Sequence, residues 1–324
     1  MWQTIGHDWA TELLQRAIDR RHVAHTYLFA GPANIGKSTL AQDLAAALNC
    51  TGAQPPCGHC QACDKVTRRI HPDVAVIEPD AGKIKIEQVR RLQHDLQLTP
   101  FEGRWRVCVV TDFQTATVEA SNALLKTLEE PPTRAAIVLT ATDASLLLPT
   151  ILSRCQVLPL RAISPRQLEN ALIDRWNAPA DLARVLARLS GGRIGWAIRA
   201  ITDSSLLTER KRRLDALWQI VPAGRAGRLQ AAEQFSKREE LADILRLWQT
   251  WWWDLVLIRS GCAELITNLD YRDILSEQAR QCDLARAEET TRRTDVTLQQ
   301  LNNNVNPRLA LEVLFLSWPQ LSMN

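Results

Sequence analysis

The first half of the chain alternates short apolar runs with amphipathic segments. Helices are expected at Ser38 to Leu48, Ile86 to Leu98 and Ala120 to Leu128. Runs rich in branched apolar side chains predict five strands: Thr26 to Ala30, Val74 to Ile77, Arg104 to Thr111, Ala136 to Thr140 and Gln156 to Leu160. Short apolar strands between helices are typical of a parallel sheet covered on both faces. We therefore predict an α/β domain over residues 1–161.

The strand pattern ends near residue 161. Residues 164–202 predict short helices interrupted at Gly191 and Gly192, and the pattern from residue 204 onward is helical. Apolar positions around Trp248 and Trp252 follow one face of a helix. We predict two further parts, a small helical domain at 162–203 and a longer one at 204–324.

Composition narrows the class of protein only a little. The 324 residues are 46% hydrophobic and 23% charged, and the net charge of +3 is too small to indicate nucleic-acid binding by itself. The N-terminus has no signal-peptide pattern. The densest apolar run, Leu247 to Ile258, is interrupted by polar residues and shorter than the ~20 residues of a membrane span. We expect a cytoplasmic protein without a membrane partner. Disulfides are rare in the cytoplasm.

Residues 31–38 fit the phosphate-binding motif G-x-x-x-x-G-K-[ST], with its glycines at Gly31 and Gly36. The motif lies between a predicted strand and a predicted helix, which is the context that a P-loop requires. Its backbone N–H groups and the helix N-terminus attract phosphates. Lys37 is expected to reach the terminal phosphates and Ser38 to ligate Mg²⁺, with Thr39 next in the nucleotide-binding segment. The motif predicts binding of ATP or ADP with Mg²⁺.

Hydrolysis requires a further acid at the end of a later apolar strand to hold Mg²⁺. The expected place is Thr111, and Asp112 follows one residue later. Because successive strand side chains point to opposite faces, Asp112 is not expected to replace an acid at position 111. Thr111 and Asp112 therefore indicate a degenerate form of this second motif, with binding favoured over hydrolysis.

Four of the eight cysteines lie within fourteen residues, at Cys50, Cys57, Cys60 and Cys63. Four thiolates at this spacing can close a tetrahedron about Zn²⁺, although His59 could compete as a ligand. Free buried cysteines and a disulfide or redox pair are the alternatives. We predict a structural zinc without a catalytic role, and packing roles for the scattered cysteines Cys108, Cys155, Cys262 and Cys282.

Two further signals each allow two interpretations. Lys83 and Lys85 precede the predicted helix at Ile86, where they could contact a DNA phosphate or form a solvated turn. Tryptophans could stack on bases, but their helical spacing with apolar neighbours favours packing; they are Trp248, Trp251, Trp252 and Trp253.

Several segments together resemble one family, the bacterial clamp-loader subunits of the AAA+ class. The most specific are residues 119–132, which include the run SNALLKTLEEPP from Ser121, and residues 151–155 (ILSRC). Residues 5–7 and 25–31, the four-cysteine segment and residues 306–312 also match, so the resemblance spans essentially the whole chain. It implies an AAA+ P-loop domain with a zinc-binding insertion at 50–63, a helical lid at 162–203 and an oligomerising collar at 204–324.

The family contains ATPase motor subunits, called gamma or tau, and non-motor subunits. Three departures favour the non-motor kind. Thr111 and Asp112 stand where the motor has an Asp-Glu pair. The motor's lid arginine aligns with Gly195, although a shift of two positions would bring Arg193 there. We also expect no motor-type extension after residue 324.

The resemblance implies a mechanism and partners. The loader is a hetero-pentameric ring in the DNA polymerase III holoenzyme that places a sliding clamp on primed DNA, and its ATP sites lie between subunits. Arg154 is then expected to act in trans as an arginine finger for a gamma/tau subunit, because a guanidinium neutralises charge that builds on the γ-phosphate. The wrench-like delta subunit is a further expected partner, and the chain itself is expected to hydrolyse little or no ATP.

Two alternatives stay open at this point. The chain could be an active gamma/tau-like ATPase that uses Asp112. It could also be an interaction module, built from the zinc site and the helices, in which the P-loop is vestigial.

Overall fold

The computed structural model describes residues 1–303 and 305–321. It divides into two compact units, residues 1–171 with 192–196, and residues 172–191 with 197–324. The finer domain boundaries at 161 and 203 stay a prediction. No helix in the described part of the chain is both long and apolar enough to cross a bilayer.

A five-stranded parallel sheet forms the centre of the first unit. In spatial order the strands are β2 (Val74–Ile77), β3 (Arg106–Val110), β4 (Ala135–Ala141), β1 (Thr26–Ala30) and β5 (Gln156–Pro159). Strand β1 pairs with β4 from Thr26 opposite Ile137 to Ala30 opposite Ala141. All five predicted strands are confirmed, with ends within two residues of those expected.

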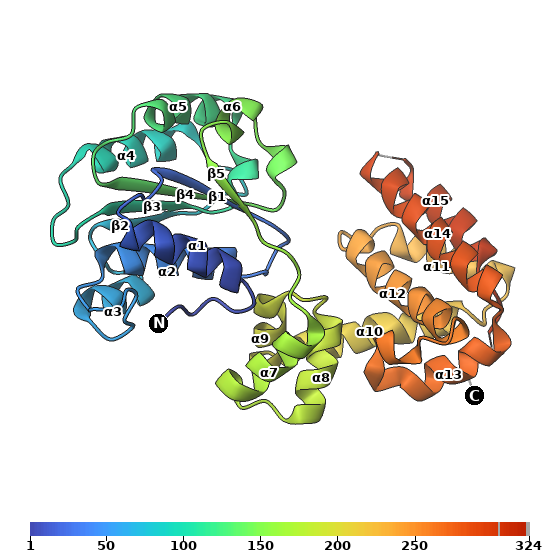
Figure 1. Ribbon diagram of the computed structural model, residues 1–324. Helices are drawn as coiled ribbons and strands as arrows, with labels where there is room; N and C mark the ends of the chain where they lie inside the picture. Colours follow the sequence, from blue (N-terminus) through green and yellow to red (C-terminus); the bar gives the residue numbers. More distant parts are fainter. Residues whose placement is uncertain (304, 322–324) are drawn as a thin grey trace. The chain divides into compact units, whose positions relative to one another are not determined.

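Helices cover both faces of this sheet (Figure 1). One face carries α1 (Asp8–Asp19), α2 (Lys37–Asn49) and α3 (Gln61–Thr67), and the other carries α4 (Ile86–Gln97), α5 (Val118–Glu129) and α6 (Pro149–Leu152). Successive side chains of β1 point to opposite faces of the sheet. Phe29 packs in the apolar cluster on the face covered by α1, α2 and α3, and Leu28 packs in the cluster on the face covered by α4, α5 and α6. The predicted α/β class with helices on both faces is confirmed.

The described residues of the second unit form helices joined by turns and contain no strand. Its helices are α8 (Ala180–Leu189), α10 (Ser205–Ile220), α11 (Arg225–Phe235), α12 (Leu241–Arg259), α13 (Arg272–Gln281), α14 (Leu284–Asn302) and α15 (Pro307–Ser317). Helices α7 (Pro165–Trp176) and α9 (Ile194–Thr202) each contribute residues to both units.

Aromatic side chains form the core of this helical unit. The ring of Trp248 lies 5.1 Å from Phe235, 5.9 Å from Phe315 and 5.7 Å from Trp318, measured between centroids. Trp251 and Trp252 are also buried, as the packing interpretation of these tryptophans predicts, whereas Trp253 is 49% exposed.

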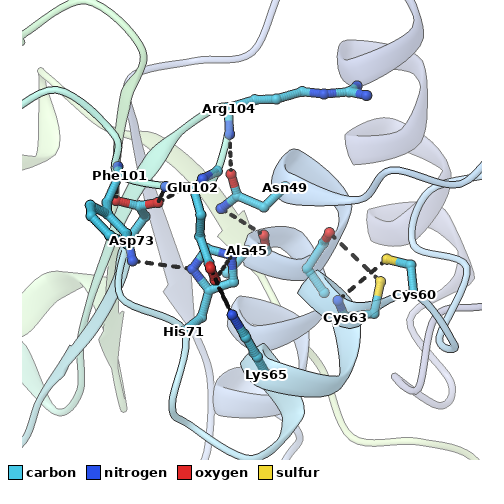
Figure 2. A network of polar contacts seen from close by, with 12 residues as sticks. Ala45, Asn49, Cys60, Cys63, Lys65, His71, Asp73, Phe101, Glu102 and Arg104 are labelled. Atoms are coloured by element: carbon cyan, nitrogen blue, oxygen red, sulfur yellow. Dashed lines mark hydrogen bonds and ion pairs between the residues drawn. The ribbon is translucent and has the colours of Figure 1, made fainter.

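Two buried polar side chains hold the loop between α4 and β3 (Figure 2). Five consecutive backbone N–H groups, of residues 101–105, donate to them: Asp73 accepts the first three at 2.7 to 2.9 Å, and Asn49 accepts the last two at 2.8 and 2.9 Å. Burial acts to raise the pKa of the Asp73 carboxyl, but these hydrogen bonds and the nearby Arg106 outweigh it and hold the pKa below its ordinary value.

We predict that Asp73→Ala lowers the free energy of unfolding by about 2–4 kcal/mol, because it removes the buried carboxylate that accepts three consecutive backbone N–H groups. Since the folded-state pKa lies below the ordinary value of about 3.9, this stabilisation is present above that pH and is lost as the pH falls further. Urea unfolding at pH 7 and pH 3 measures both effects. Asp80→Ala, which alters only an exposed ion pair, is the matched control. Equal stability of the two variants would contradict the assigned role of Asp73.

Candidate functional site

The P-loop motif forms the turn between β1 and α2. A Cβ atom at Gly31 would lie 2.3 Å from the carbonyl oxygen of Leu160, so this position accepts only glycine. Gly36 has a φ of 110°, a conformation that other residues rarely adopt. Helix α2 begins at Lys37, and the first N–H groups of a helix have no acceptor within it. The turn therefore ends in a helix N-terminus that can accept an anion.

Lys37 is folded back onto this loop. Its Nζ donates to the carbonyl oxygens of Gly31 at 2.6 Å and Pro32 at 2.9 Å, and the residue is 7% exposed. Burial lowers the pKa of Lys37, and the negative charge of Asp112 opposes this shift. Ser38 is exposed and Thr39 is half-buried on the same helical turn. To reach a phosphate, Lys37 has to exchange carbonyl partners for phosphate oxygens.

The residues after β3 differ from the expectation. The strand ends at Val110, and Asp112 lies in the following turn with a φ of 49°. We expected Asp112 not to replace an acid at position 111 because neighbouring strand side chains point to opposite faces. That reason is wrong, since Asp112 lies outside the strand and the alternation applies only within one. The Thr111 hydroxyl donates to the carbonyl oxygen of Ile77 at 3.3 Å, whereas the charge of Asp112 acts on Lys37.

Thr140 is a site residue that the sequence analysis missed. It lies in β4, is 1% exposed, and its Oγ1 accepts the N–H of Asp112 at 3.0 Å. A polar residue near the end of an otherwise apolar run was the available signal. Because β1, β3 and β4 are parallel, the P-loop, Asp112 and Thr140 lie at or just after the carboxyl ends of these strands, where open α/β sheets bind ligands.

Two further residues of the first unit contact the P-loop. The Nε2 atom of His7 lies 3.1 Å from the carbonyl oxygen of Ile35, and burial lowers the pKa of this imidazole. The N–H of Gly195 donates to the carbonyl oxygen of Asn34 at 2.8 Å. A Cβ at Gly195 would lie 3.1 Å from that oxygen, so a larger residue would be crowded there.

Arg154 follows the single-turn helix α6. Its Nη1 donates to the carbonyl oxygen of Thr150 at 2.9 Å and to Oγ of Ser153 at 3.1 Å, and its Nη2 lies 2.5 Å from Oε1 of Glu129. The Arg154 side chain is 33% exposed. Glu129 belongs to the SNALLKTLEEPP segment, so the two most specific motifs of the chain meet at this ion pair. The role of Arg154 as a finger stays a prediction.

The two lysines before α4 differ in their contacts. Lys85 is the N-cap residue of α4, and its Nζ pairs with Asp80 at 2.7 Å. Lys83 shares a short backbone bridge with Asp80. The charge of Lys85 is thus already offset, and a DNA contact by either lysine stays a prediction.

The clustered cysteines converge around the end of α2 and the start of α3. Their sulfur atoms all lie within 4.8 Å of one another, and the Cys57–Cys63 and Cys50–Cys60 pairs are each separated by 4.0 Å. Thiolates at ~2.3 Å from a tetrahedral zinc stand about 3.8 Å apart. The four residues could therefore hold a structural zinc ion. His59 is exposed and lies outside this group.

Backbone N–H groups surround these sulfurs. Cys50 Sγ accepts from Gly52 and Cys57, Cys57 Sγ accepts from Cys60, and Cys60 Sγ accepts from Cys63, at 3.3 to 3.5 Å. Burial acts to raise the pKa of Cys60, but its hydrogen bonds lower it to about 5, whereas burial raises the pKa of Cys63 to about 12. A metal ion would supply the positive charge that a buried thiolate requires. Of the remaining cysteines, Cys108 and Cys282 are buried and Cys155 and Cys262 are half-buried.

Comparison with known families gives two matches along this chain. Residues 6–164 match the family described as DNA polymerase III, delta subunit. Residues 204–320 match the family described as DNA polymerase III, delta subunit, C terminal. The first match contains the P-loop, the cysteine cluster and Arg154, and the second contains most of the helical unit.

Individual relatives agree with these matches. The chain is 34% identical to DNA polymerase III subunit delta' of Bacillus subtilis over 180 residues, and 40% identical to that of Pseudomonas aeruginosa over 192 residues. These alignments cover 55% and 57% of this chain, and 54% and 58% of the relatives. The Escherichia coli tau subunit is 34% identical over 209 residues, or 62% of this chain and 32% of tau. The chain thus spans little more than half of the two delta' relatives.

We predict that Cys60→Ser removes one equivalent of bound zinc and lowers the thermal unfolding midpoint by about 5–10 °C, because a three-sulfur site loses affinity for the metal. Elemental analysis and calorimetry of protein prepared without chelators measure both quantities. Cys262→Ser, outside the cluster, is the control and should retain the metal. Absence of zinc from the unmodified protein would refute the site.

Proposed function

We infer the function of this chain from its family. The chain belongs to the DNA polymerase III delta-prime family, which is related to the gamma and tau clamp-loader subunits. The proposed function is to help load a sliding clamp onto primed DNA as a non-motor subunit of the clamp loader. In this role the chain is a scaffold and supplies Arg154 in trans to the ATP site of a gamma/tau subunit. Its own ATP hydrolysis is weak or absent.

The residue at position 111 carries this proposal. Thr111 stands where a motor subunit has its metal-linked acid, and its hydroxyl is bonded to the Ile77 carbonyl. A neutral side chain adds no negative charge to hold Mg²⁺. The P-loop itself has an open helix N-terminus, with Lys37 and Ser38 on its first turn. This combination supports binding of ATP or ADP with Mg²⁺ but not efficient turnover.

The exposure of Arg154 supports the finger role. The side chain is one-third exposed and lies at the end of a short helix rather than in a core, so another subunit can approach it. A guanidinium that reaches the γ-phosphate stabilises the charge that develops during transfer. Its position in the Ser-Arg-Cys motif is the further support.

Helix α15 supports assembly with other subunits. Leu309, Val313 and Leu316 are 58%, 66% and 44% exposed, and their spacing places them on one face of the helix. Exposed apolar surface of this kind is typical of interaction sites. We propose that this surface takes part in a hetero-pentamer with gamma/tau and delta subunits, whose further partners are the sliding clamp and primed DNA.

Asp112 favours one second candidate function, that of an active ATPase of the gamma/tau type. Its carboxylate lies after the end of β3 and acts electrostatically on Lys37. A carboxylate near the P-loop lysine could hold Mg²⁺ even though it lies in the turn after β3 and not at the end of the strand. Turnover by the isolated chain separates this candidate from the non-motor proposal.

We predict that the isolated chain binds a fluorescent ATP analogue with Mg²⁺ but hydrolyses ATP far more slowly than about one turnover per second. Lys37→Ala should weaken binding about 100-fold because it removes the cation that pairs with the phosphates. Lys83→Ala, outside the P-loop, is the control. Turnover near one per second that Lys37→Ala abolishes would establish the motor function instead, and tight binding excludes the interaction module with a vestigial P-loop.

We predict that Arg154→Ala lowers the DNA-dependent ATPase of the reconstituted loader by about tenfold, because one ATP site loses its transition-state cation. Nucleotide binding by the chain itself should not change. Arg68→Ala, an exposed arginine that is likewise paired with one carboxylate, is the matched control. An ATPase rate equal to that of the control would show that the finger assignment is wrong.

A further inference from the structure

The ion pair between Glu129 and Arg154 joins the ends of α5 and α6, two helices on the same face of the sheet. Glu129 is the last residue of α5, and Arg154 follows the C-cap of α6. Leu128 of α5 and Ile151 of α6 belong to the same buried cluster, so both helices are anchored beneath the pair. The backbone therefore fixes the two ends from which the side chains meet.

Three contacts define the position of the Arg154 guanidinium. Nη1 makes two hydrogen bonds, to the Thr150 carbonyl and the Ser153 hydroxyl, and Nη2 makes one, to Glu129. A guanidinium has five N–H donors, so two remain after these bonds. These are on Nε and Nη2. Arg154 therefore retains donors for a phosphate oxygen while its bond to Glu129 is in place.

The pair contributes more to order than to folding. The two side chains are 33% and 51% exposed, and exposed ion pairs add little to stability. A long arginine side chain, however, loses much rotamer freedom when it is held in one position. If the bond to Glu129 already holds the Arg154 side chain in one position, this loss of conformational entropy does not occur again when the chain docks on the neighbouring subunit.

We propose that Glu129 is a positioning residue, which holds the Arg154 guanidinium ready for the ATP site of the neighbouring subunit. This inference rests on the proposed finger role of Arg154. It assigns the glutamate at the end of α5 to the reaction at the subunit boundary, through Arg154 and without a contact of its own with nucleotide.

The test is Glu129→Gln in the reconstituted loader, with Glu130→Gln as the matched control, since Glu130 is the adjacent exposed glutamate. Glu129→Gln should lower kcat of the DNA-dependent ATPase threefold to fivefold and leave KM for ATP and the thermal stability of the chain unchanged. In an Arg154→Ala background it should cause no further loss, because the residue through which it acts is absent. An increase in kcat would overturn the proposal, since it would mean that Glu129 restrains Arg154.

The outcomes separate this inference from the proposed function. If Arg154→Ala leaves the ATPase unchanged, the finger role fails and the inference fails with it. If Arg154→Ala lowers the rate but Glu129→Gln behaves as Glu130→Gln does, only the positioning role fails. Nitrogen-15 NMR of the isolated chain gives an independent readout: rotation about the Arg154 guanidinium should be slow and become faster in Glu129→Gln. Equal rotation rates in the two proteins would refute the proposal.

Discussion

Strand β1 is hydrogen-bonded to a neighbouring strand on both of its edges, and this pairing sets the position of the P-loop that follows it. All five residues of this strand are buried, so their backbone groups have to be paired with protein, and β4 and β5 supply those partners. The pairing brings Gly31 against the carbonyl oxygen of Leu160 and places the P-loop at the carboxyl edge of the sheet. Asp112 and Thr140 reach the same edge because β3 and β4 run parallel to β1.

The sequence was sufficient for the sheet because parallel strands buried on both faces are continuous apolar runs. The cysteine cluster could also be predicted, since its four residues are close along the chain. The end of β3 could not, because β-branched Thr111 is compatible with a strand and only the structure gives Asp112 its positive φ. The Glu129–Arg154 pair escaped prediction for another reason, since its partners are 25 positions apart and neither pattern indicates the other.

Opposite charges serve the two sides of an ATP site, and this chain lacks an acid at position 111 but has an exposed arginine at position 154. Mg²⁺ requires negative ligands near the P-loop, and Thr111 does not provide one. The developing charge of phosphoryl transfer requires a cation, and Arg154 is an exposed one. If Arg154 acts as proposed, the P-loop domain of this chain is mainly architecture, and its contribution to the chemistry lies at the boundary with a neighbouring subunit.

The proximity of Asn49 to the cysteine cluster has a consequence for the order of folding. Contacts among Cys50, Cys57, Cys60 and Cys63 are local in sequence, whereas the contact of Asn49 with Arg104 spans 55 positions, so the cysteines can come together earlier in folding. Asn49 ends α2 directly before Cys50, and its side chain later accepts the N–H groups of Arg104 and Trp105. A metal ion held by the four cysteines would thus fix the end of α2, and with it the Asn49 side chain that accepts N–H groups from the loop before β3.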